Sequence, residues 1–382
     1  MSAAEPVYLD YAATTPVDAR VLEAMLPYFT THFGNPSSLY SYGRTARQAV
    51  AQARQQVASL LGAEPGEIFF TSGGSESDNW VLKGMAFAQL RASGKKHIIT
   101  TTIEHHAVLN ACKWLEAQGF TVTYLPVDDV GRVTAEQVAA ALRDDTALVS
   151  IMYANNEVGT IEPIAEIGAL LHEQGVFFHT DAVQAAGHVP IDVQQLQVDA
   201  LSLSGHKLYG PKGTGALYLR RGWQLDSLVH GGAQEREQRA GTENVPGLVG
   251  LGQAAMLAQH EMSAEQARLT ALRTQLIEGL QALPGVSING SLTQRLPGNV
   301  NFRIKGIDHE VLLIRLDLAG FAVSAGSACS AGSLEPSHVL LAMGQSAAEA
   351  QEAVRVTLGR YTTAADIAAF LAELKRIVGI LR

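Results

Sequence analysis

The chain has 382 residues, of which 47% are hydrophobic, and this length suits about two globular domains of ~150 residues each. It holds 37 acidic and 28 basic residues, a net charge of −9, with no run of Lys and Arg, which argues against a general nucleic-acid or membrane binder. Two cysteines cannot form a disulfide framework, and the N-terminus shows no secretory signal. No apolar stretch reaches the ~20 residues that span a bilayer. We therefore expect a cytoplasmic α/β enzyme.

Short apolar runs alternate with helical patterns through the first two thirds of the chain. Residues 76–94 and 164–175 have the pattern of helices. Unbroken apolar strands that alternate with helices predict a mostly parallel sheet that is buried on both faces. The runs that we predict as strands are residues 67–73, 96–105, 121–127, 147–156, 175–182 and 199–207.

The last third of the chain has a different pattern and predicts a smaller α+β unit. Residues 245–283 have a helical pattern with one polar face, and helices close the chain. We place a boundary near residue 256, with a large cofactor-binding domain of residues 15–255 and a small domain of residues 1–14 and 256–382. The strand-like segments of this part are residues 286–291, 298–306 and 321–327, and residues 308–320 separate the last two.

Glycines and a serine follow the first predicted strand, at the edge where an open α/β sheet binds its ligands. Ser72, Gly73 and Gly74 open a long helix, whose backbone N–H groups and dipole favour an anion such as phosphate. Ser75 with Asp78 three residues later resembles a capping box. A plain capped helix after a tight turn is the alternative interpretation, because turns of Gly and Ser are common.

Two further strand ends carry an acid and a lysine. Asp181, followed by Gln184, comes after one strand, and Lys207 ends the next. A partly desolvated lysine with a lowered pKa is the type that forms Schiff bases, and an acid at a neighbouring strand end could keep a pyridine nitrogen protonated. A phosphate cradle, an acid and a lysine are together the parts that a pyridoxal-phosphate site requires, although a lone lysine is usually only solvated.

With these residues in view, the sequence resembles the cysteine desulfurases, pyridoxal-phosphate enzymes of the class V aminotransferase group that serve nitrogen fixation and iron–sulfur cluster assembly. The resemblance runs from residue 8 to residue 363, nearly the whole chain. It implies the pyridoxal-phosphate fold type I, with a mostly parallel seven-stranded sheet in the large domain and a smaller α+β C-terminal domain. The motifs that carry it are TSGGSESDN, IEHHAV, ANNEVGTIEPI, HTDAVQAAG, SLSGHKLYGPKGTGALY, RAGTENV, SAGSAC and TLGRYTT.

The resemblance assigns cofactor roles to individual residues. It implies that Lys207 binds the cofactor covalently, that Asp181 pairs with its ring nitrogen, and that His105 stacks on the ring and relays protons. His105 or its neighbour His106 could otherwise be an ordinary core or solvated histidine. The other cofactor contacts that it implies are Asn155 and Gln184 at the ring substituents and Gly74, Ser75, Ser204 and His206 at the phosphate. Asn155 and Asn156 would otherwise be interpreted as a turn pair.

The resemblance also implies contacts to the substrate and to a second subunit. Asn35 and Arg360 would hold the substrate carboxylate, a planar anion that suits the fork of an arginine. Thr242 would reach the phosphate in the other subunit, which implies a homodimer. We expect no metal site. Arg360 lies where an ordinary surface arginine could also lie.

Cys329 lies in a segment that holds only Ser, Ala and Gly besides it, from Ser324 to Ser333. The resemblance implies that its thiolate takes the sulfur of L-cysteine as a persulfide, releases L-alanine, and then passes the sulfur to an acceptor or cluster scaffold protein. Such a composition suits a flexible loop, and we expect residues of about 325 to 333 to be mobile when no partner is bound. We interpret Cys112 as a core residue of a helix, without a function.

Other interpretations stay open. Within the cofactor group, the chain could be a selenocysteine lyase, a sulfinate desulfinase or an aminotransferase, although an aminotransferase does not need Cys329. Outside it, Gly205 and Gly210 have the spacing of a P-loop, but Pro211 and Lys212 follow where adjacent Gly and Lys are needed. A sulfur carrier without catalytic activity is the last alternative, in which the cofactor residues would have no purpose.

Overall fold

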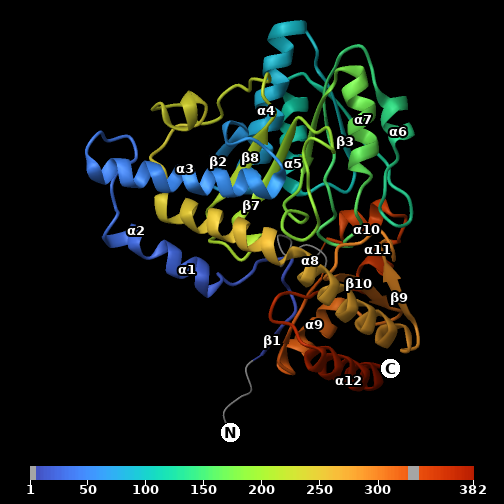
Figure 1. The fold of residues 1–382 in the computed structure, drawn as a ribbon. Helices are drawn as coiled ribbons and strands as arrows, with labels where there is room; N and C mark the ends of the chain where they lie inside the picture. Colours follow the sequence, from blue (N-terminus) through green and yellow to red (C-terminus); the bar gives the residue numbers. More distant parts are fainter. Residues whose placement is uncertain (1–5, 326–334) are drawn as a thin grey trace.

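The computed structural model of the chain describes residues 6–325 and 335–382 (Figure 1). Cys329 lies outside the described residues, and so does almost all of the segment that we expect to be mobile. Within the part of the chain that the structure describes, no helix is both long enough and apolar enough to cross a membrane.

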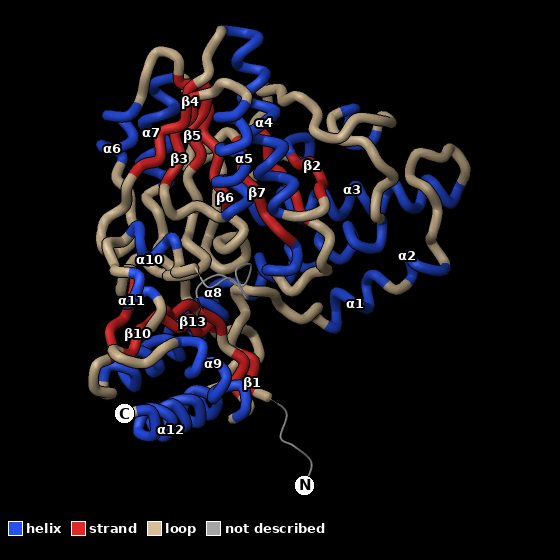
Figure 2. Tube along the Cα trace, turned by 180° about the vertical axis from the view of Figure 1, so that it is seen from behind, coloured by secondary structure: helices blue, strands red, loops and turns tan. Residues whose placement is uncertain are grey.

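A seven-stranded sheet forms the centre of the larger part of the molecule (Figure 2). Its strands lie in the order β2, β8, β7, β6, β5, β3, β4. Strand β8 is antiparallel to both of its neighbours and the other adjacent pairs are parallel, so the expected mostly parallel sheet is confirmed. The strands are β2 Ile68–Thr71, β3 His97–Thr101, β4 Thr121–Leu125, β5 Thr146–Ser150, β6 Phe177–Asp181, β7 Ala200–Ser204 and β8 Gly215–Leu219.

Helices cover both faces of this sheet, because successive residues of each strand point to opposite sides. On β6, Phe177 packs among residues of α4 and α5, whereas Phe178 packs among residues of α3, α6 and α7. Burial on both faces explains why these strands have unbroken apolar runs in the sequence. The helices are α3 Ser41–Leu61, α4 Gly74–Ser93, α5 His106–Ala117, α6 Ala135–Ala141 and α7 Ile164–Gln174.

A four-stranded antiparallel sheet in the order β12, β13, β10, β9 forms the smaller part. Helices α9 and α12 and the second half of α8 enclose its core, which contains Leu276, Phe302 and Phe370. The sequence predicts only helices after the last strand-like segment, and this prediction is wrong, because β13 lies there. All five residues of β13 are buried, and its sequence AVRVT has the apolar–polar alternation of a strand. The bounds are β9 Val286–Asn289, β10 Asn299–Ile304, α9 His309–Leu318, β12 Ser324–Ala325, β13 Ala353–Thr357 and α12 Ala364–Leu381.

Helix α8 (Val245–Gln281) joins the two parts and confirms the helix predicted there. Leu248 and Leu251 in its first half pack in the core of the large part, and Leu269 and Leu272 in its second half pack in the core of the small part. The boundary placed near residue 256 falls inside this continuous helix, and the domain limits stay a prediction. Strand β1 (Val7–Tyr8) pairs in parallel with β11 (Phe321–Ala322), and the short helices α10 (His338–Ala342) and α11 (Ala347–Ala350) precede β13.

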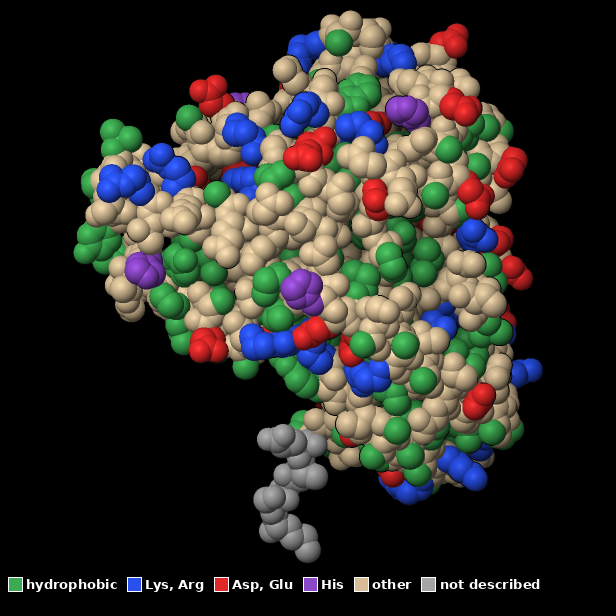
Figure 3. Space-filling view, in the orientation of Figure 1, with side chains coloured by type: hydrophobic (Ala, Val, Ile, Leu, Met, Phe, Trp, Pro, Cys, Tyr) green, Lys and Arg blue, Asp and Glu red, His purple; other side chains and the backbone are tan. Residues whose placement is uncertain are grey.

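An arm of α1 (Ala19–Met25), α2 (Pro27–Thr30) and the first turns of α3 extends from one side of the large part (Figure 1). Hydrophobic side chains gather on the surface of this arm (Figure 3). The exposed large hydrophobic residues are Leu22, Leu26, Phe29, Phe33, Leu39, Tyr40 and Tyr42, and we call this set the apolar arm.

Candidate active site

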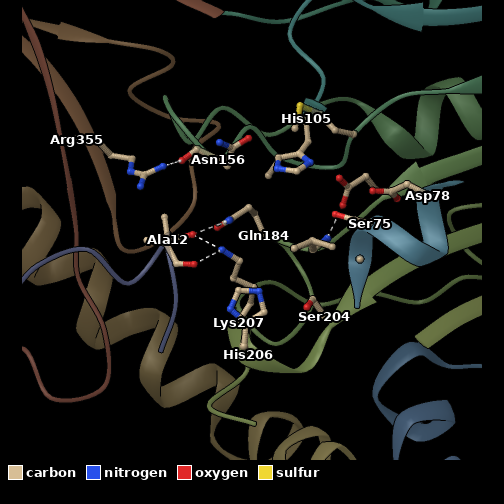
Figure 4. A pocket seen from close by; sticks show the side chains of 16 residues that line it. Ala12, Ser75, Asp78, His105, Asn156, Gln184, Ser204, His206, Lys207 and Arg355 are labelled. Carbon is tan, nitrogen blue, oxygen red and sulfur yellow. Dashed lines mark hydrogen bonds between the residues drawn. The ribbon is translucent and has the colours of Figure 1, made fainter. Parts of the chain in front are cut away.

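A cavity of about 200 Å³, partly open to solvent, lies at the carboxyl ends of β5, β6 and β7, beside the start of α4 (Figure 4). This is the edge of a parallel sheet where ligands bind. Residues from the N-terminal segment and from the small sheet close it. Eight of the expected site residues line the cavity, namely Gly74, Ser75, His105, Asp181, Gln184, Ser204, His206 and Lys207, together with Ala12, Ala13, Asp78, Met152, Ala154, Asn156, Val183 and Arg355.

The start of α4 forms one end of the cavity. No side chain among the described residues caps this helix at Gly73, and its positive dipole end favours an anion. A Cβ at Gly74 would lie 2.6 Å from Cγ2 of Val183, so this close approach needs glycine. The capping box expected from Ser75 and Asp78 is wrong, because the helix already begins at Gly74 and Asp78 is buried one turn further on.

Ser204 and His206 lie at the same end of the cavity. Ser204 ends β7, and its hydroxyl oxygen would lie 3.8 Å from a Cβ at Gly73. The Nδ1 atom of His206 lies 3.0 Å from the hydroxyl oxygen of Thr14. Burial lowers the pKa of His206 to about 4, so the ring is neutral at neutral pH. An anion in this place would therefore be bound mainly by hydrogen bonds and the helix dipole.

Lys207 reaches into the cavity from the 3₁₀ turn Gly205–Lys207 that follows β7. Its Nζ atom donates to the carbonyl oxygen of Ala13 at 2.8 Å and also to that of Ala12. The side-chain amide of Gln184 donates to the same Ala12 carbonyl at 3.1 Å (Figure 4). The N-terminal segment therefore holds the amine at the wall of the cavity.

Asp181 is the last residue of β6 and faces the same cavity. One oxygen of its carboxyl group accepts the backbone N–H of Val183 at 2.9 Å. Burial raises the pKa of Asp181 to about 6, although the Val183 N–H and the charge of Lys207 act in the opposite direction. Asp181 can therefore share a proton with a basic nitrogen at neutral pH.

His105 is a neutral ring with a fixed orientation. It is the N-cap residue of α5, and its Nδ1 atom accepts the backbone N–H of Ala107 at 3.1 Å. Because Nδ1 accepts this hydrogen bond, the proton of the neutral ring is on Nε2. Burial is the main reason that the pKa of His105 falls to about 4, and the nearby charges of His106 and Lys207 add to it.

Asp78, which the sequence did not mark as a site residue, also lines the cavity. Its Oδ1 atom has no hydrogen-bond partner among the described residues and lies 3.8 Å from Nε2 of His179. The His179 ring lies between the hydroxyl groups of Ser150 at 2.9 Å and Ser202 at 3.0 Å. Burial raises the pKa of Asp78 well above its usual value, and the charge of Asp181 raises it further. The carboxyl group of Asp78 therefore keeps its proton to a higher pH than an exposed aspartate does.

The structure turns Asn156, not the expected Asn155, toward the cavity (Figure 4). Asn155 is fully buried, and its amide nitrogen donates to the carbonyl of Ile103 at 3.0 Å. Its side-chain oxygen accepts the backbone N–H groups of Glu157 and Val158 at 2.8 and 3.0 Å. Asn155 thus holds the loop after β5 in place, and this leaves Asn156 at the wall of the cavity.

The guanidinium group that lines the cavity belongs to Arg355, and the structure does not bring Arg360 there. Arg355 lies in β13 with its side chain 1% exposed, pairs with Asp10 at 2.8 Å and donates to the carbonyl of Asn156 at 2.9 Å. Arg360 lines a separate cavity, because two carboxylates outside the site hold its side chain. The signal that could have found Arg355 is an arginine inside an apolar run, since arginine is rarely buried.

Asn35 and Thr242 do not line the cavity of this chain, and both are exposed. Asn35 lies in the loop before α3, where its side-chain oxygen accepts the backbone N–H of Ser37 at 2.9 Å. Thr242 lies in the loop before α8. Cys329 is outside the described residues. Cys112 is fully buried on α5, as expected.

The P-loop alternative is wrong. A P-loop leads from a strand into the N-terminus of a helix. Here the segment from Gly205 to Gly210 leads from β7 to β8, an antiparallel strand of the same sheet. The backbone N–H groups of a helix start are therefore supplied by α4 and not by this segment.

Comparisons with known proteins identify the family of the chain. The family model of class V aminotransferases matches residues 7–370. The chain is 56% identical to a cysteine desulfurase IscS of Methanosarcina thermophila, over 98% of this chain and 93% of that protein. It is 51% identical to a putative cysteine desulfurase IscS 1 of Bacillus subtilis, over 95% of this chain and 96% of that protein.

Two solved structures are also similar. A NifS-like protein has a TM-score of 0.92 and 40% sequence identity, over 98% of this chain and 100% of that one. SspA in complex with cysteine has a TM-score of 0.82 and 42% identity, over 94% of this chain and 100% of that one. The chain therefore belongs to the class V aminotransferase family, among the cysteine desulfurases.

Proposed function

We propose that this protein removes the sulfur of L-cysteine with bound pyridoxal phosphate and releases L-alanine. The observation that carries the proposal is the meeting of Lys207, Asp181 and the start of α4 in one cavity, in a chain 56% identical to a cysteine desulfurase. Pyridoxal phosphate supplies an electron sink that weakens the Cα–H bond and then the Cβ–S bond of an amino acid.

The residues of the cavity fit this cofactor. Its phosphate suits the start of α4, where Gly74 leaves room beside Val183 and the hydroxyl groups of Ser75 and Ser204 are at hand. Asp181, with a pKa of about 6, suits the ring nitrogen. Lys207 is the covalent partner of the cofactor.

Lys207 and His105 are the proton carriers of the proposal. The Nζ atom of Lys207, held beside the carbonyl groups of Ala12 and Ala13, takes the Cα proton of cysteine. His105 carries its proton on Nε2, because Nδ1 accepts the N–H of Ala107, so it can give that proton to a basic atom of the substrate.

Arg355 replaces Arg360 in the proposal as the partner of the substrate carboxylate. Arg355 lines the cavity, and its Nε atom has no hydrogen-bond partner among the described residues. A guanidinium group pairs well with a carboxylate, and the Asp10 contact keeps the rest of this side chain in place. Asn156 lines the same wall and offers an amide beside it.

Cys329 is the sulfur acceptor of the proposal. A bond forms between its Sγ atom and the substrate sulfur while the Cβ–S bond breaks, and Cβ takes a proton. One cysteine and one enzyme thiol thus become one alanine and one enzyme persulfide, without an added oxidant. The outer sulfur then passes to a thiol-bearing acceptor or a cluster scaffold protein.

The proposal includes a homodimer in which Thr242 reaches the phosphate site of the other subunit. Thr242 is exposed in the single chain. The apolar arm offers a large hydrophobic surface on the same part of the molecule (Figure 3). Contiguous exposed apolar patches of this kind are typical of protein–protein interfaces.

The test is to load the protein with pyridoxal phosphate, add L-cysteine and a thiol reductant, and quantify alanine and sulfide. We expect equal amounts of both products. Cys329→Ser should keep the absorbance of the bound cofactor and its change on addition of cysteine, yet form no alanine above background. Cys112→Ala is the matched control and should desulfurate normally, because this buried thiol only packs.

Each outcome of this test has one meaning. Normal alanine formation by Cys329→Ser would show that the cysteine role is wrong. A wild-type protein that binds pyridoxal phosphate but makes pyruvate from cysteine would show that the reaction is wrong. Turnover of L-selenocysteine, measured in parallel, decides the alternative substrate.

A further inference from the structure

Tyr209 ends the turn that carries Lys207, and its backbone is in a conformation that its residue type disfavours. Its φ is +62°, in the left-handed region that residues other than glycine rarely adopt. A side-chain-bearing residue keeps such a conformation only where its surroundings hold it, and such positions cluster at functional sites. We call residues 206–209 the lysine turn.

The N-terminal segment holds both ends of the lysine turn. The hydroxyl group of Thr15 accepts the backbone N–H of Tyr209 at 3.0 Å and donates to the carbonyl of His206 at 2.9 Å. The backbone N–H of Thr15 donates to the same carbonyl at 3.0 Å, and the N–H of Asp18 donates to the carbonyl of Tyr209 at 3.0 Å. These contacts fix the backbone on either side of Lys207.

Arg360 holds the side chain of Tyr209 from the small part of the molecule. Its backbone N–H donates to the phenol oxygen of Tyr209 at 2.6 Å, and its guanidinium carbon lies 4.5 Å from the centre of the same ring. Burial raises the pKa of Tyr209, so the phenol is neutral. Arg360 thus contacts both the hydroxyl group and the ring face of Tyr209, the residue whose backbone is in the left-handed region.

Two carboxylates fix the guanidinium group of Arg360 over that ring. One arm pairs with Asp18 and the other with Glu261 at 2.9 Å, and the side chain is only 17% exposed. Because Asp18 also donates its backbone N–H to Tyr209, the three residues Arg360, Asp18 and Tyr209 form a closed ring of contacts. Both arms and the face of the Arg360 guanidinium therefore bind groups outside the cavity, namely Asp18, Glu261 and the Tyr209 ring.

Arg20 provides a natural comparison with Arg360. It pairs with the same two carboxylates, Asp18 at 2.9 Å and Glu261 at 2.6 Å, but its side chain is 48% exposed and no contact to Tyr209 is found. The contact with Tyr209 is thus what distinguishes Arg360 from a member of an ordinary ion-pair cluster.

We propose that Arg360 is a positioning residue that fixes the lysine turn through Tyr209, and that it does not bind the substrate. The proposal rests on the proposed function only in taking Lys207 as the lysine that binds the cofactor. In this arrangement the small part of the molecule controls, through Arg360, how Lys207 is oriented toward the cavity.

The test measures how stable the link between Lys207 and pyridoxal phosphate is, in the loaded protein without cysteine. Two readouts apply, the rate at which hydroxylamine releases the cofactor and the pH midpoint of the visible absorption band. Arg360→Gln removes the guanidinium but keeps the backbone N–H. We expect release to be about two- to fivefold faster, the factor that corresponds to one cation–π contact, together with a shifted pH midpoint. Arg20→Gln should match the wild type in both readouts.

Three results would overturn the proposal. The first is wild-type cofactor release by Arg360→Gln with a KM for cysteine raised about tenfold or more, since this is the signature of a substrate-binding arginine. The second is an equal change in Arg20→Gln. The third is wild-type behaviour of Tyr209→Leu, which removes both the ring and the phenol oxygen that Arg360 contacts. This variant also tests the proposal if Arg360→Gln does not fold. A wild-type protein that binds no cofactor would instead refute the proposed function.

Discussion

At the scale of single residues, Asp78 is buried near Asp181, with only 1% of it exposed. Its Oδ1 atom lies 3.8 Å from Nε2 of the neutral His179 ring. Burial, and then the charge of Asp181, raise the pKa of Asp78 well above its value of about 3.9 in an unfolded chain. At a pH between the pKa of Asp78 in the unfolded chain and its higher pKa in the folded chain, folded Asp78 binds a proton that unfolded Asp78 has released. The contribution of this group to stability is therefore fully present below about pH 4 and is lost as the pH rises toward the folded pKa.

Replacement of Asp78 by Asn, which is close in shape to the protonated acid, should remove this loss. We expect the two proteins to be equally stable below about pH 4 and Asp78→Asn to be more stable at about pH 8, with a difference that grows by at most about 1.4 kcal/mol per pH unit. Thermal unfolding of both proteins across this range is the measurement, and Asp129→Asn, at an exposed loop position, is the control. A variant that loses stability mainly at the higher pH would mean that Asp78 is ionised.

At the scale of secondary structure, the start of α4 depends on one close contact. A Cβ at Gly74 would lie 2.6 Å from Cγ2 of Val183, although alanine is otherwise the better helix former. Gly74→Ala should therefore push the helix start away from the loop after β6 and weaken binding of pyridoxal phosphate. Overpacking of this kind costs about 1–3 kcal/mol, which corresponds to about 5- to 150-fold in affinity.

The double variant Gly74→Ala/Val183→Ala separates this contact from other effects. Removal of the Val183 methyl groups gives the new Cβ room, so the affinity for pyridoxal phosphate should return to within about threefold of Val183→Ala alone. The dissociation constants come from absorbance titration of the cofactor-free chains. If the double variant binds as weakly as Gly74→Ala, the cause is the helix start itself and not the clash.

The sequence predicts the site residues that follow strands better than those that depend on tertiary packing. Asp181 ends β6 and Lys207 lies in the turn after the neighbouring parallel strand β7, so the topology of the sheet alone brings them to one edge. The sequence does not decide between Asn155 and Asn156, because the choice depends on which side chain satisfies the buried loop backbone. Strand β13 was missed although Val354 and Val356 alternate with Arg355 and Thr357, because so short an alternation between helical segments is a weak signal.

At the scale of the whole molecule, the cavity combines residues that are far apart in the chain. Ala12 comes from the N-terminal segment and Arg355 from the small sheet, and the ion pair of Arg355 with Asp10 joins these two regions. Arg355 and Arg360 lie five residues apart, yet one lines the cavity and the other clamps Tyr209 from outside. The way the small sheet docks on the large one decides between them, and no local pattern in the sequence reports that docking.

At the scale of the whole molecule, the proposed dimer can be tested at the apolar arm. Phe33 is 65% exposed in the single chain, and its ring centre lies 5.4 Å from that of Tyr42, another residue of the apolar arm. Phe33→Asp would place a charge in a desolvated interface. Truncation of an aromatic residue at the centre of an interface costs about 2 kcal/mol or more. The dissociation constant of the dimer should therefore rise by about 30-fold or more. Sedimentation of the cofactor-loaded protein over a dilution series is the measurement.

Leu318→Asp is the matched control for this experiment. Leu318 is 81% exposed on α9, away from the apolar arm, and should tolerate the charge without any change in oligomeric state. If Thr242 reaches the phosphate of the other subunit, Phe33→Asp should also release pyridoxal phosphate faster once it is monomeric, whereas Leu318→Asp should not. Dissociation by Leu318→Asp and not by Phe33→Asp would place the interface on the small sheet and leave the apolar arm without a partner.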